Sequence, residues 1–157
     1  MIKLKNYFLA FAAIALMFTF ACGGDDGPSE PTAEELRLTA LAGDSGVTWR
    51  AVSITQDGSP ANGFDNFSLT MRGTADSKTY TSSDADPLIA ASGPWAFNGT
   101  NLNQLIFNDD SDNVFNISNL NTDATPATVT LTVNFTNPNG GGAAGASGTY
   151  VFNLQAQ

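Results

Sequence analysis

The sequence predicts an all-β protein with about eight antiparallel strands, which follow one another as an up-and-down meander and close into a barrel or barrel-like sheet. Two observations predict this fold. From Gly46 onward, apolar and polar residues alternate with a period of two in short runs, and turn-forming Gly, Asp, Asn and Pro residues separate the runs. The intervals between runs are too short for crossover helices, so consecutive strands should pair antiparallel.

One short helix is expected before the strands, over residues 32–41. Thr32 is a candidate N-cap, and Glu35 stands three residues later, which is the spacing of a capping box. Three leucines give the segment an apolar surface: Leu36, Leu38 and Leu41. The helix should therefore pack against the β domain.

Eight runs with strand-like alternation follow the helix. They cover residues 47–55, 66–72, 77–82, 94–98, 103–108, 113–119, 127–136 and 148–154. The run 127–136 alternates most clearly, because Val129, Leu131, Val133 and Phe135 fall on one face and Thr or Asn on the other. Each run has one apolar face, which predicts a single core. Closure into a barrel would leave no exposed edge strand, while a two-sheet β-sandwich fits the same pattern and remains the alternative.

The N-terminal 21 residues differ from the rest of the chain. Lys3 and Lys5 precede the uncharged run 7–20, and the small residue Ala21 stands before Cys22. A basic segment, a short apolar segment and a small residue at the cleavage site are typical of a signal peptide. The apolar run is shorter than the roughly 20 residues of a membrane-spanning helix. We interpret residues 1–21 as a signal peptide.

Cys22 is the only cysteine, so it cannot form an intramolecular disulfide. The stretch 18–22 resembles a bacterial lipobox, in which the cysteine is diacylated and becomes the new N-terminus. Two acyl chains give stable attachment to a membrane. This predicts residues 22–33 as a lipidated cysteine with a flexible, acidic tether, and residues 34–157 as the β domain with its short helix.

The composition excludes several classes of function. The chain has no His, a single Cys and a formal net charge of −9. The commonest general base, the commonest metal ligand and any thiolate metal site are therefore missing. A strongly acidic surface also repels nucleic acid. We expect a non-enzymatic protein without a cofactor, which does not bind nucleic acid and is a monomer.

The order of strands and aromatic residues resembles a known group. Trp49 lies early in the first strand, a Gly-Pro-Trp-Ala-Phe run covers residues 93–97, and Gly-Thr-Tyr-Val-Phe-Asn-Leu closes the chain at 148–154. This order is similar to that of the lipocalin-like small lipoproteins common in one large phylum of Gram-negative bacteria. The resemblance spans residues 43–156 and implies an antiparallel, barrel-like fold in the cell envelope. The expected location is the outer membrane, on its periplasmic or its surface-exposed side.

Two candidate sites follow from the residues. An eight-stranded barrel can hold one small ligand, and four aromatic residues could line a cavity for an apolar molecule: Trp49, Trp95, Phe97 and Tyr150. The alternative is that these side chains fill the core. Asp109, Asp110 and Asp112 form a weak candidate for a Ca²⁺ site, but the spacing of a calcium-binding loop is missing. An acidic hairpin turn is the favoured interpretation of these residues.

Two functions are therefore open at this stage. The first is a lipid-anchored envelope protein that binds a small apolar ligand inside its barrel. The second is a structural or adhesive surface lipoprotein with a filled core and no small ligand. A cavity lined by Trp49, Trp95 and Phe97 would favour the first function, and a filled interior would favour the second.

Overall fold

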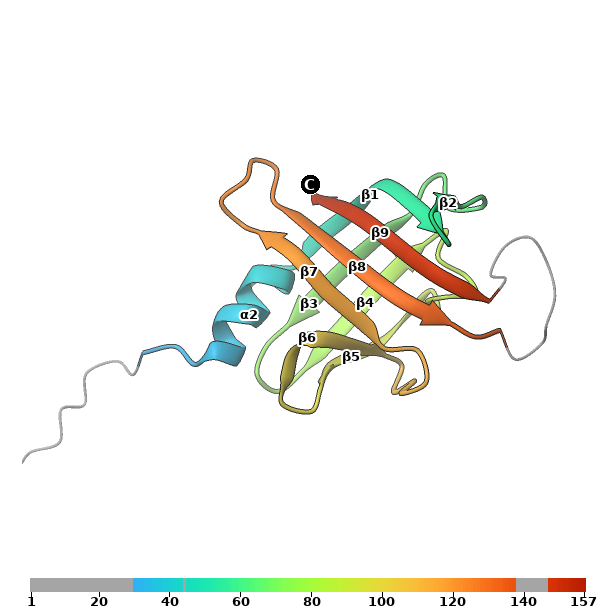
Figure 1. Ribbon diagram of the computed structural model, residues 1–157. Coiled ribbons are helices and arrows are strands. Elements are labelled where there is room, and N and C mark those ends of the chain that lie inside the picture. The colour runs from blue at the N-terminus through green and yellow to red at the C-terminus, as the bar shows by residue number, and fades with distance from the viewer. Residues whose placement is uncertain (1–29, 44, 138–146) are drawn as a thin grey trace, which may run out of the picture. The chain divides into compact units, whose positions relative to one another are not determined.

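The computed structural model describes residues 30–43, 45–137 and 147–157, and residues 32–157 form one compact unit. Helix α2 spans Ala33–Ala42 (Figure 1). The strands are β1 (Val47–Gln56), β2 (Ser59–Pro60), β3 (Ser68–Gly73), β4 (Lys78–Ser83), β5 (Ser92–Asn98), β6 (Asn101–Phe107), β7 (Phe115–Asn121), β8 (Thr128–Phe135) and β9 (Gly148–Ala156). All strand pairs are antiparallel.

The sheet closes on itself. Its strand order is β2-β1-β3-β4-β5-β6-β7-β8-β9, and β1 also pairs with β9. The closing pair runs from Trp49↔Ala156 to Gln56↔Tyr150, with one β-bulge between Ala51 and Ser53. The eight long strands therefore form a closed up-and-down barrel. This confirms the predicted barrel, and the two-sheet sandwich does not form because one continuous ladder joins all strands.

The short strand β2 was not predicted. Asp57 and Gly58 both have positive φ angles, of 50° and 81°, and they connect β1 to β2 as a two-residue hairpin, in which Gln56 pairs with Ser59. Proline has no backbone N–H to donate and is found in sheets mainly at edges. Because β2 is only two residues long and lies outside the closed ring, Pro60 is tolerated.

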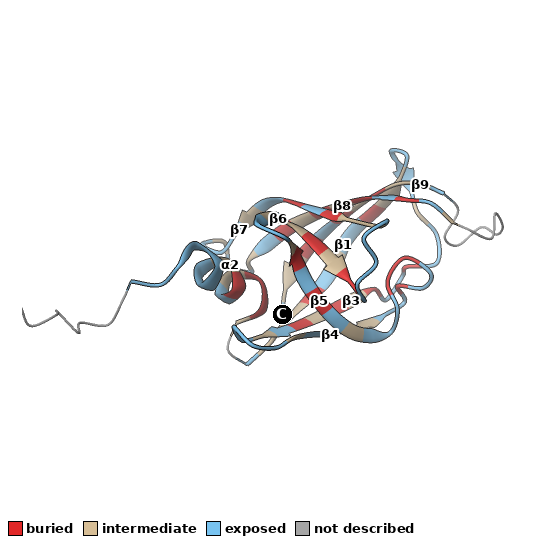
Figure 2. Ribbon diagram, turned by 90° about the horizontal axis from the view of Figure 1, so that it is seen from below, coloured by how far each residue is buried: buried red, intermediate tan, exposed pale blue. Residues whose placement is uncertain are grey.

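Alternation along the strands separates core from surface, as Figure 2 shows by the red and pale bands of the barrel wall. In β8 the predicted inward residues are buried: Val129, Leu131, Val133 and Phe135. In β9 the same holds for Tyr150, Phe152 and Leu154. No polar or charged residue is buried among the described residues. Apart from the hydroxyls of Tyr80 and Tyr150 and the indole N–H groups of Trp49 and Trp95, the core is therefore apolar, as one inward face per strand requires.

Helix α2 begins where the capping box predicts. The Thr32 hydroxyl accepts a hydrogen bond from the backbone N–H of Glu35 at 3.2 Å, and the Glu35 carboxylate accepts one from the backbone N–H of Thr32 at 2.6 Å. Leu38, Leu41 and Ala42 are buried against the barrel, whereas Leu36 is 58 % exposed. The apolar face thus includes two of the three predicted leucines.

The barrel has two ends with different covers. We call the helix end the one that carries α2 and the turns at residues 74–77, 99–100 and 122–127. Strand β1 leads away from it, so the loops at residues 57–67, 84–91 and 108–114 lie at the opposite end, which we call the loop end (Figure 1). The loop end is covered by apolar side chains from two of these loops: Phe64, Phe67, Ala85, Leu88 and Ile89.

Candidate functional site

The four aromatic residues of the candidate cavity all point into the barrel but do not line one common space. Trp49 is the third residue of β1, and Tyr150 is the third residue of β9. These two strands are antiparallel neighbours. Trp49 therefore lies near the helix end and Tyr150 near the loop end. Trp95 and Phe97 lie in the half of β5 that leads to the helix end and contact each other edge to face, with ring centroids 5.4 Å apart.

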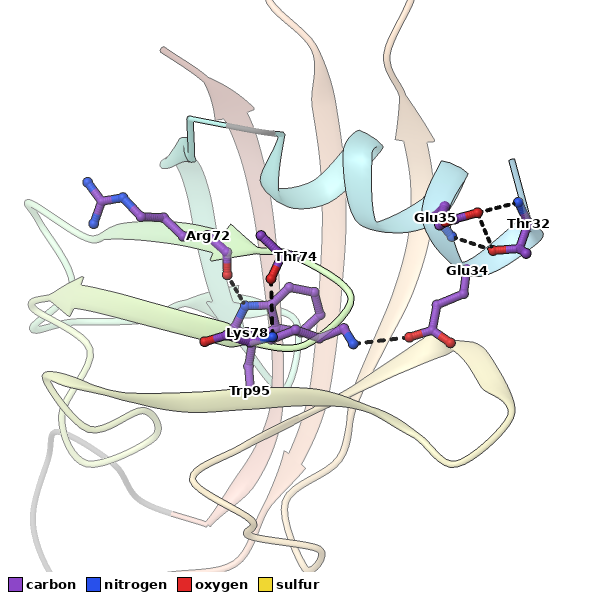
Figure 3. A network of polar contacts seen from close by, with 8 residues as sticks. Thr32, Glu34, Glu35, Arg72, Thr74, Lys78 and Trp95 are labelled. Carbon is purple, nitrogen blue, oxygen red and sulfur yellow. Dashed lines mark hydrogen bonds and ion pairs between the residues drawn. The ribbon is translucent and has the colours of Figure 1, made fainter. Parts of the chain in front are cut away.

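Both tryptophans are fixed by hydrogen bonds near the helix end. The indole N–H of Trp49 donates to the backbone carbonyl of Leu41 in α2 at 2.9 Å. The indole N–H of Trp95 donates to the carbonyl of Arg72 in β3 at 3.0 Å, as Figure 3 shows. These bonds satisfy the only polar atom of each side chain. Both rings are therefore held in place, Trp95 within the barrel wall and Trp49 at the contact between the barrel and α2.

Tyr150 belongs to a separate aromatic group at the loop end. Its ring packs at a steep angle against Phe64 and Phe135, with centroids 5.9 Å and 6.4 Å away. Phe64 also contacts Phe152, at 6.2 Å. Sequence reasoning missed Phe64, because it is a single aromatic residue in an irregular loop and belongs to no alternating run.

Aromatic rings from walls that are not neighbours meet inside the barrel. Tyr80 of β4 contacts Phe107 of β6 with centroids 4.9 Å apart, and Phe115 of β7 contacts Phe152 of β9 at 6.2 Å. In each pair one whole strand separates the partners in the sheet. The rings therefore extend past the intervening strand and fill part of the interior.

Solvent exposure leads to the same conclusion. An internal cavity large enough for water would leave accessible area on the side chains around it, whereas Trp49 is 1 %, Trp95 3 %, Phe97 8 % and Tyr150 0 % exposed. A ring of eight strands is just wide enough for its own side chains to fill. The four predicted cavity residues are thus part of a packed core.

The two buried tyrosines are kept in their neutral form by their surroundings. Burial raises the pKa of the Tyr80 hydroxyl, and burial together with the nearby negative charge of Asp57 raises the pKa of Tyr150. A raised pKa keeps a phenol protonated and neutral at ordinary pH. Neither tyrosine is therefore prepared to act as a base.

The acidic turn at residues 109–112 is organised by its own hydrogen bonds. One carboxylate oxygen of Asp110 accepts from the backbone N–H of Asp112 at 3.1 Å, and the other accepts from the Asn113 side-chain amide at 2.7 Å. Asp109 and Asp112 are exposed. Among the described residues there is no group of three or more His, Cys, Asp or Glu side chains placed to hold a metal ion. The three aspartates of the calcium candidate are consequently not assembled into a site.

The hollows of the described surface lie outside the barrel interior. One of about 320 Å³ at the loop end is lined by Ser82, Asp84, Asp86 and Ile89 among others. Another, of about 480 Å³, is lined by Asp110, Asp112, Asn113 and Thr136. A smaller hollow of about 200 Å³ lies beside α2 and includes Leu38 and Gly73. A further hollow of about 370 Å³ lies at the helix end and is lined by Asp76, Lys78 and Trp95 among others. The three larger hollows have aspartates in their lining and do not resemble an apolar ligand site.

Comparison with known proteins adds no assignment: no family model, no curated protein and no solved structure matches this chain. The signal peptide predicted at residues 1–21, Cys22 and the tether up to residue 29 lie outside the described residues. In the described part of the chain, none of the helical segments has the length and apolar character of a membrane span.

Proposed function

We propose that this chain is a non-enzymatic, lipid-anchored protein of the bacterial cell envelope, whose filled barrel is a rigid scaffold that presents surface loops. The observation that carries the proposal is the packed interior. Rings such as Phe115 and Phe152 contact each other inside it, and the aromatic residues expected to line a cavity are buried. Binding a small apolar ligand would require these side chains to leave a close-packed arrangement, which is costly.

Three features support the absence of catalysis. The chain has no histidine, and the carboxylates of the described residues lie in the helix and the loops, outside the core. The two tyrosines of the interior have raised pKa values. General acid–base chemistry needs a titratable group with a suitable pKa within reach of a bound substrate.

The anchor is proposed from the sequence around Cys22. A cysteine directly after a short apolar segment, followed by a polar tether, is the arrangement from which a diacylated N-terminus is made. The described residues contain only two large exposed apolar side chains, Leu36 and Val52. The domain thus has little apolar surface with which to insert into a bilayer, and attachment depends on the lipid. The outer membrane, on either side, is the proposed location, and a monomer the proposed state.

The anchor is tested by labelling with palmitate in the native host. Wild-type chain should incorporate the label and float with membranes, while the Cys22→Ala variant should do neither. A Cys22→Ser variant is the matched control, because it keeps the size of the side chain and removes the thiol. Label that persists in either variant would show that Cys22 is not the lipidated residue.

The filled interior is tested by native mass spectrometry of the protein purified from its host. We expect the mass of the polypeptide with its lipid and no second small molecule. A stoichiometric apolar molecule that co-purifies and is lost on unfolding would favour the carrier function over the scaffold.

A further inference from the structure

Charge is divided unequally between the two ends of the barrel. The described residues of the loop end carry seven exposed aspartates and no Lys or Arg: Asp57, Asp65, Asp84, Asp86, Asp109, Asp110 and Asp112. All four cations of the compact unit lie at or next to the helix end: Arg37, Arg50, Arg72 and Lys78. The described acidic residues of that end of the unit are also four, namely Glu34, Glu35, Asp76 and Asp123. Among the described residues, the helix end is therefore near neutral and the loop end strongly negative.

Two of the cations are engaged in local contacts, and two are presented to solvent. Lys78 forms an ion pair with Glu34 at 3.0 Å (Figure 3). Arg37 donates to the carbonyl of Leu102 at 3.1 Å and to the side chain of Asn103. Arg50 and Arg72 are exposed on the halves of β1 and β3 nearest the helix end. The two exposed arginines thus lie at the same end of the barrel as Thr32, where the compact unit begins.

The length of the tether alone does not determine how the domain faces a membrane. From Cys22 to Thr32 the chain has ten peptide units, which span at most about 35 Å when fully extended. A tilted strand of ten residues, such as β1, gives the barrel a height of roughly 25 Å. An anchored domain could consequently turn over and bring either end of the barrel to the lipid. The difference in charge between the two ends must then determine which end faces the lipid.

We infer that the anchored domain stands on an anionic phospholipid surface with its helix end toward the lipid and its loop end away from it; this inference rests on the proposed lipid anchor. The negative surface potential attracts exposed arginines and repels aspartates near it. Because the screening length is about 8 Å at physiological ionic strength, charge at the distant end of the barrel is hardly affected. Repulsion acts on the seven aspartates only when the loop end is turned toward the lipid.

The consequence for function is that the loop end is the face presented to partners. Its loops carry the seven exposed aspartates and two of the described hollows, of about 480 Å³ and 320 Å³. The helix end, by contrast, is directed toward the lipid headgroups, where Arg50 and Arg72 meet anionic phosphate.

The test uses the full, lipidated chain in vesicles and two reporter positions at opposite ends of β6. Thr100→Cys lies in the β5–β6 turn at the helix end, and Ser111→Cys lies in the β6–β7 loop at the loop end; both positions are exposed. Acylation blocks the thiol of Cys22, so each variant carries one reactive thiol for a fluorophore. Nitroxide on the lipid headgroups then quenches whichever fluorophore is close to the surface.

On vesicles with phosphatidylglycerol we expect quenching at position 100 to exceed that at position 111 by at least about twofold, and the ratio to fall toward one at high salt. Asp86→Asn, Asp109→Asn and Asp112→Asn together should lower the ratio. Asp76→Asn with Asp123→Asn is the control at the helix end and should not lower it. A chain that fails to float with the vesicles overturns both the anchor and the orientation. A chain that floats but is quenched equally at both positions, or more at position 111, overturns the orientation alone.

Discussion

The two ends of the barrel exclude water from the same core by different means. At the helix end a regular element is fixed by directed bonds: the capping box at Thr32 and the hydrogen bond from the Trp49 indole to Leu41. At the loop end irregular segments contribute single apolar side chains, such as Phe64, which rests edge-on against Tyr150 and Phe152. Directed bonds require particular residues at particular positions, whereas packing from loops requires only apolar volume.

This difference shows where the chain can tolerate changes in its sequence. The helix end tolerates few substitutions, since the side chains of Leu38 and Trp95 pack closely against Gly73 there. The loop end combines a few buried anchors with long polar stretches, and these stretches hold seven aspartates and two hollows among the described residues. Binding residues are commonly found on loops that a rigid scaffold positions. The comparison therefore supports the loop end as the face that interacts with partners.

The largest expected effect comes from removing one aromatic anchor at each end. Trp49→Ala should lower the free energy of unfolding by about 3–5 kcal/mol, because it leaves a cavity under α2 and removes the bond to Leu41. Phe64→Ala should cost less, about 3 kcal/mol or below, because a loop can collapse into the space more easily than a helix held by hydrogen bonds. Urea unfolding followed by circular dichroism measures both. If Phe64→Ala lowered the free energy of unfolding as much as Trp49→Ala does, the distinction between the two ends would not hold.

Two glycines give a second, smaller contrast. A Cβ at Gly73 would lie 2.6 Å from Leu38 Cδ1 and 3.3 Å from Trp95 Cζ2, so Gly73→Ala should overpack the helix contact and cost about 1–3 kcal/mol. A Cβ at Gly58, in the β1–β2 turn of the loop end, would meet nothing within 4 Å. Gly58→Ala should lower the free energy of unfolding by only about 1 kcal/mol, because the φ angle at this position is positive.

Tryptophan fluorescence separates the two glycine effects. Both tryptophans lie near the helix end, so Gly73→Ala should change the emission of the folded protein and Gly58→Ala should leave it unchanged. An unchanged spectrum for Gly73→Ala would mean that Leu38 moves aside without disturbing α2.

The parts of this fold that the sequence predicts are those with a local period or a local bond. Alternation predicts that Val129 and its neighbours of β8 point inward, and the Thr32–Glu35 spacing predicts the start of the helix. Each of these signals depends on residues a few positions apart. They were accordingly readable without any knowledge of the tertiary structure.

The remaining features depend on contacts between distant residues. Phe64, Leu88 and Ile89 complete the core from loops that show no period. The separation of Trp49 from Tyr150 could have been foreseen, since each is the third residue of its strand and the first and last strands of a closed meander pair antiparallel. The predicted cavity treated the four aromatic residues as one set because it considered the face of each strand and not the position along it.

The smallest expected effect concerns acid and the capping box of the helix end. Hydrogen bonds from the backbone N–H and the hydroxyl of Thr32 lower the pKa of the Glu35 carboxyl below its usual value of 4.5. A group whose pKa is lower in the folded state contributes stability above its unfolded pKa and loses it as the pH falls through the folded pKa. The first turn of α2 should therefore fray on acidification below about pH 4.5, before the barrel unfolds.

This prediction is checked by the Cα chemical shifts of residues 33–37 between pH 6 and pH 2.5. Glu35→Gln is the matched control: its amide keeps an acceptor for Thr32 but cannot titrate, so the shifts should lose this pH dependence. Thr32→Ala should weaken the same dependence, because it removes the hydroxyl but keeps the backbone N–H that donates to Glu35. It should destabilise the helix by about 1 kcal/mol at neutral pH. Identical titration of the helix in wild type and Glu35→Gln would mean that the carboxylate is not what holds the first turn. Of the two directed bonds at the helix end, only the one from the Trp49 indole to Leu41 would then distinguish it from the loop end.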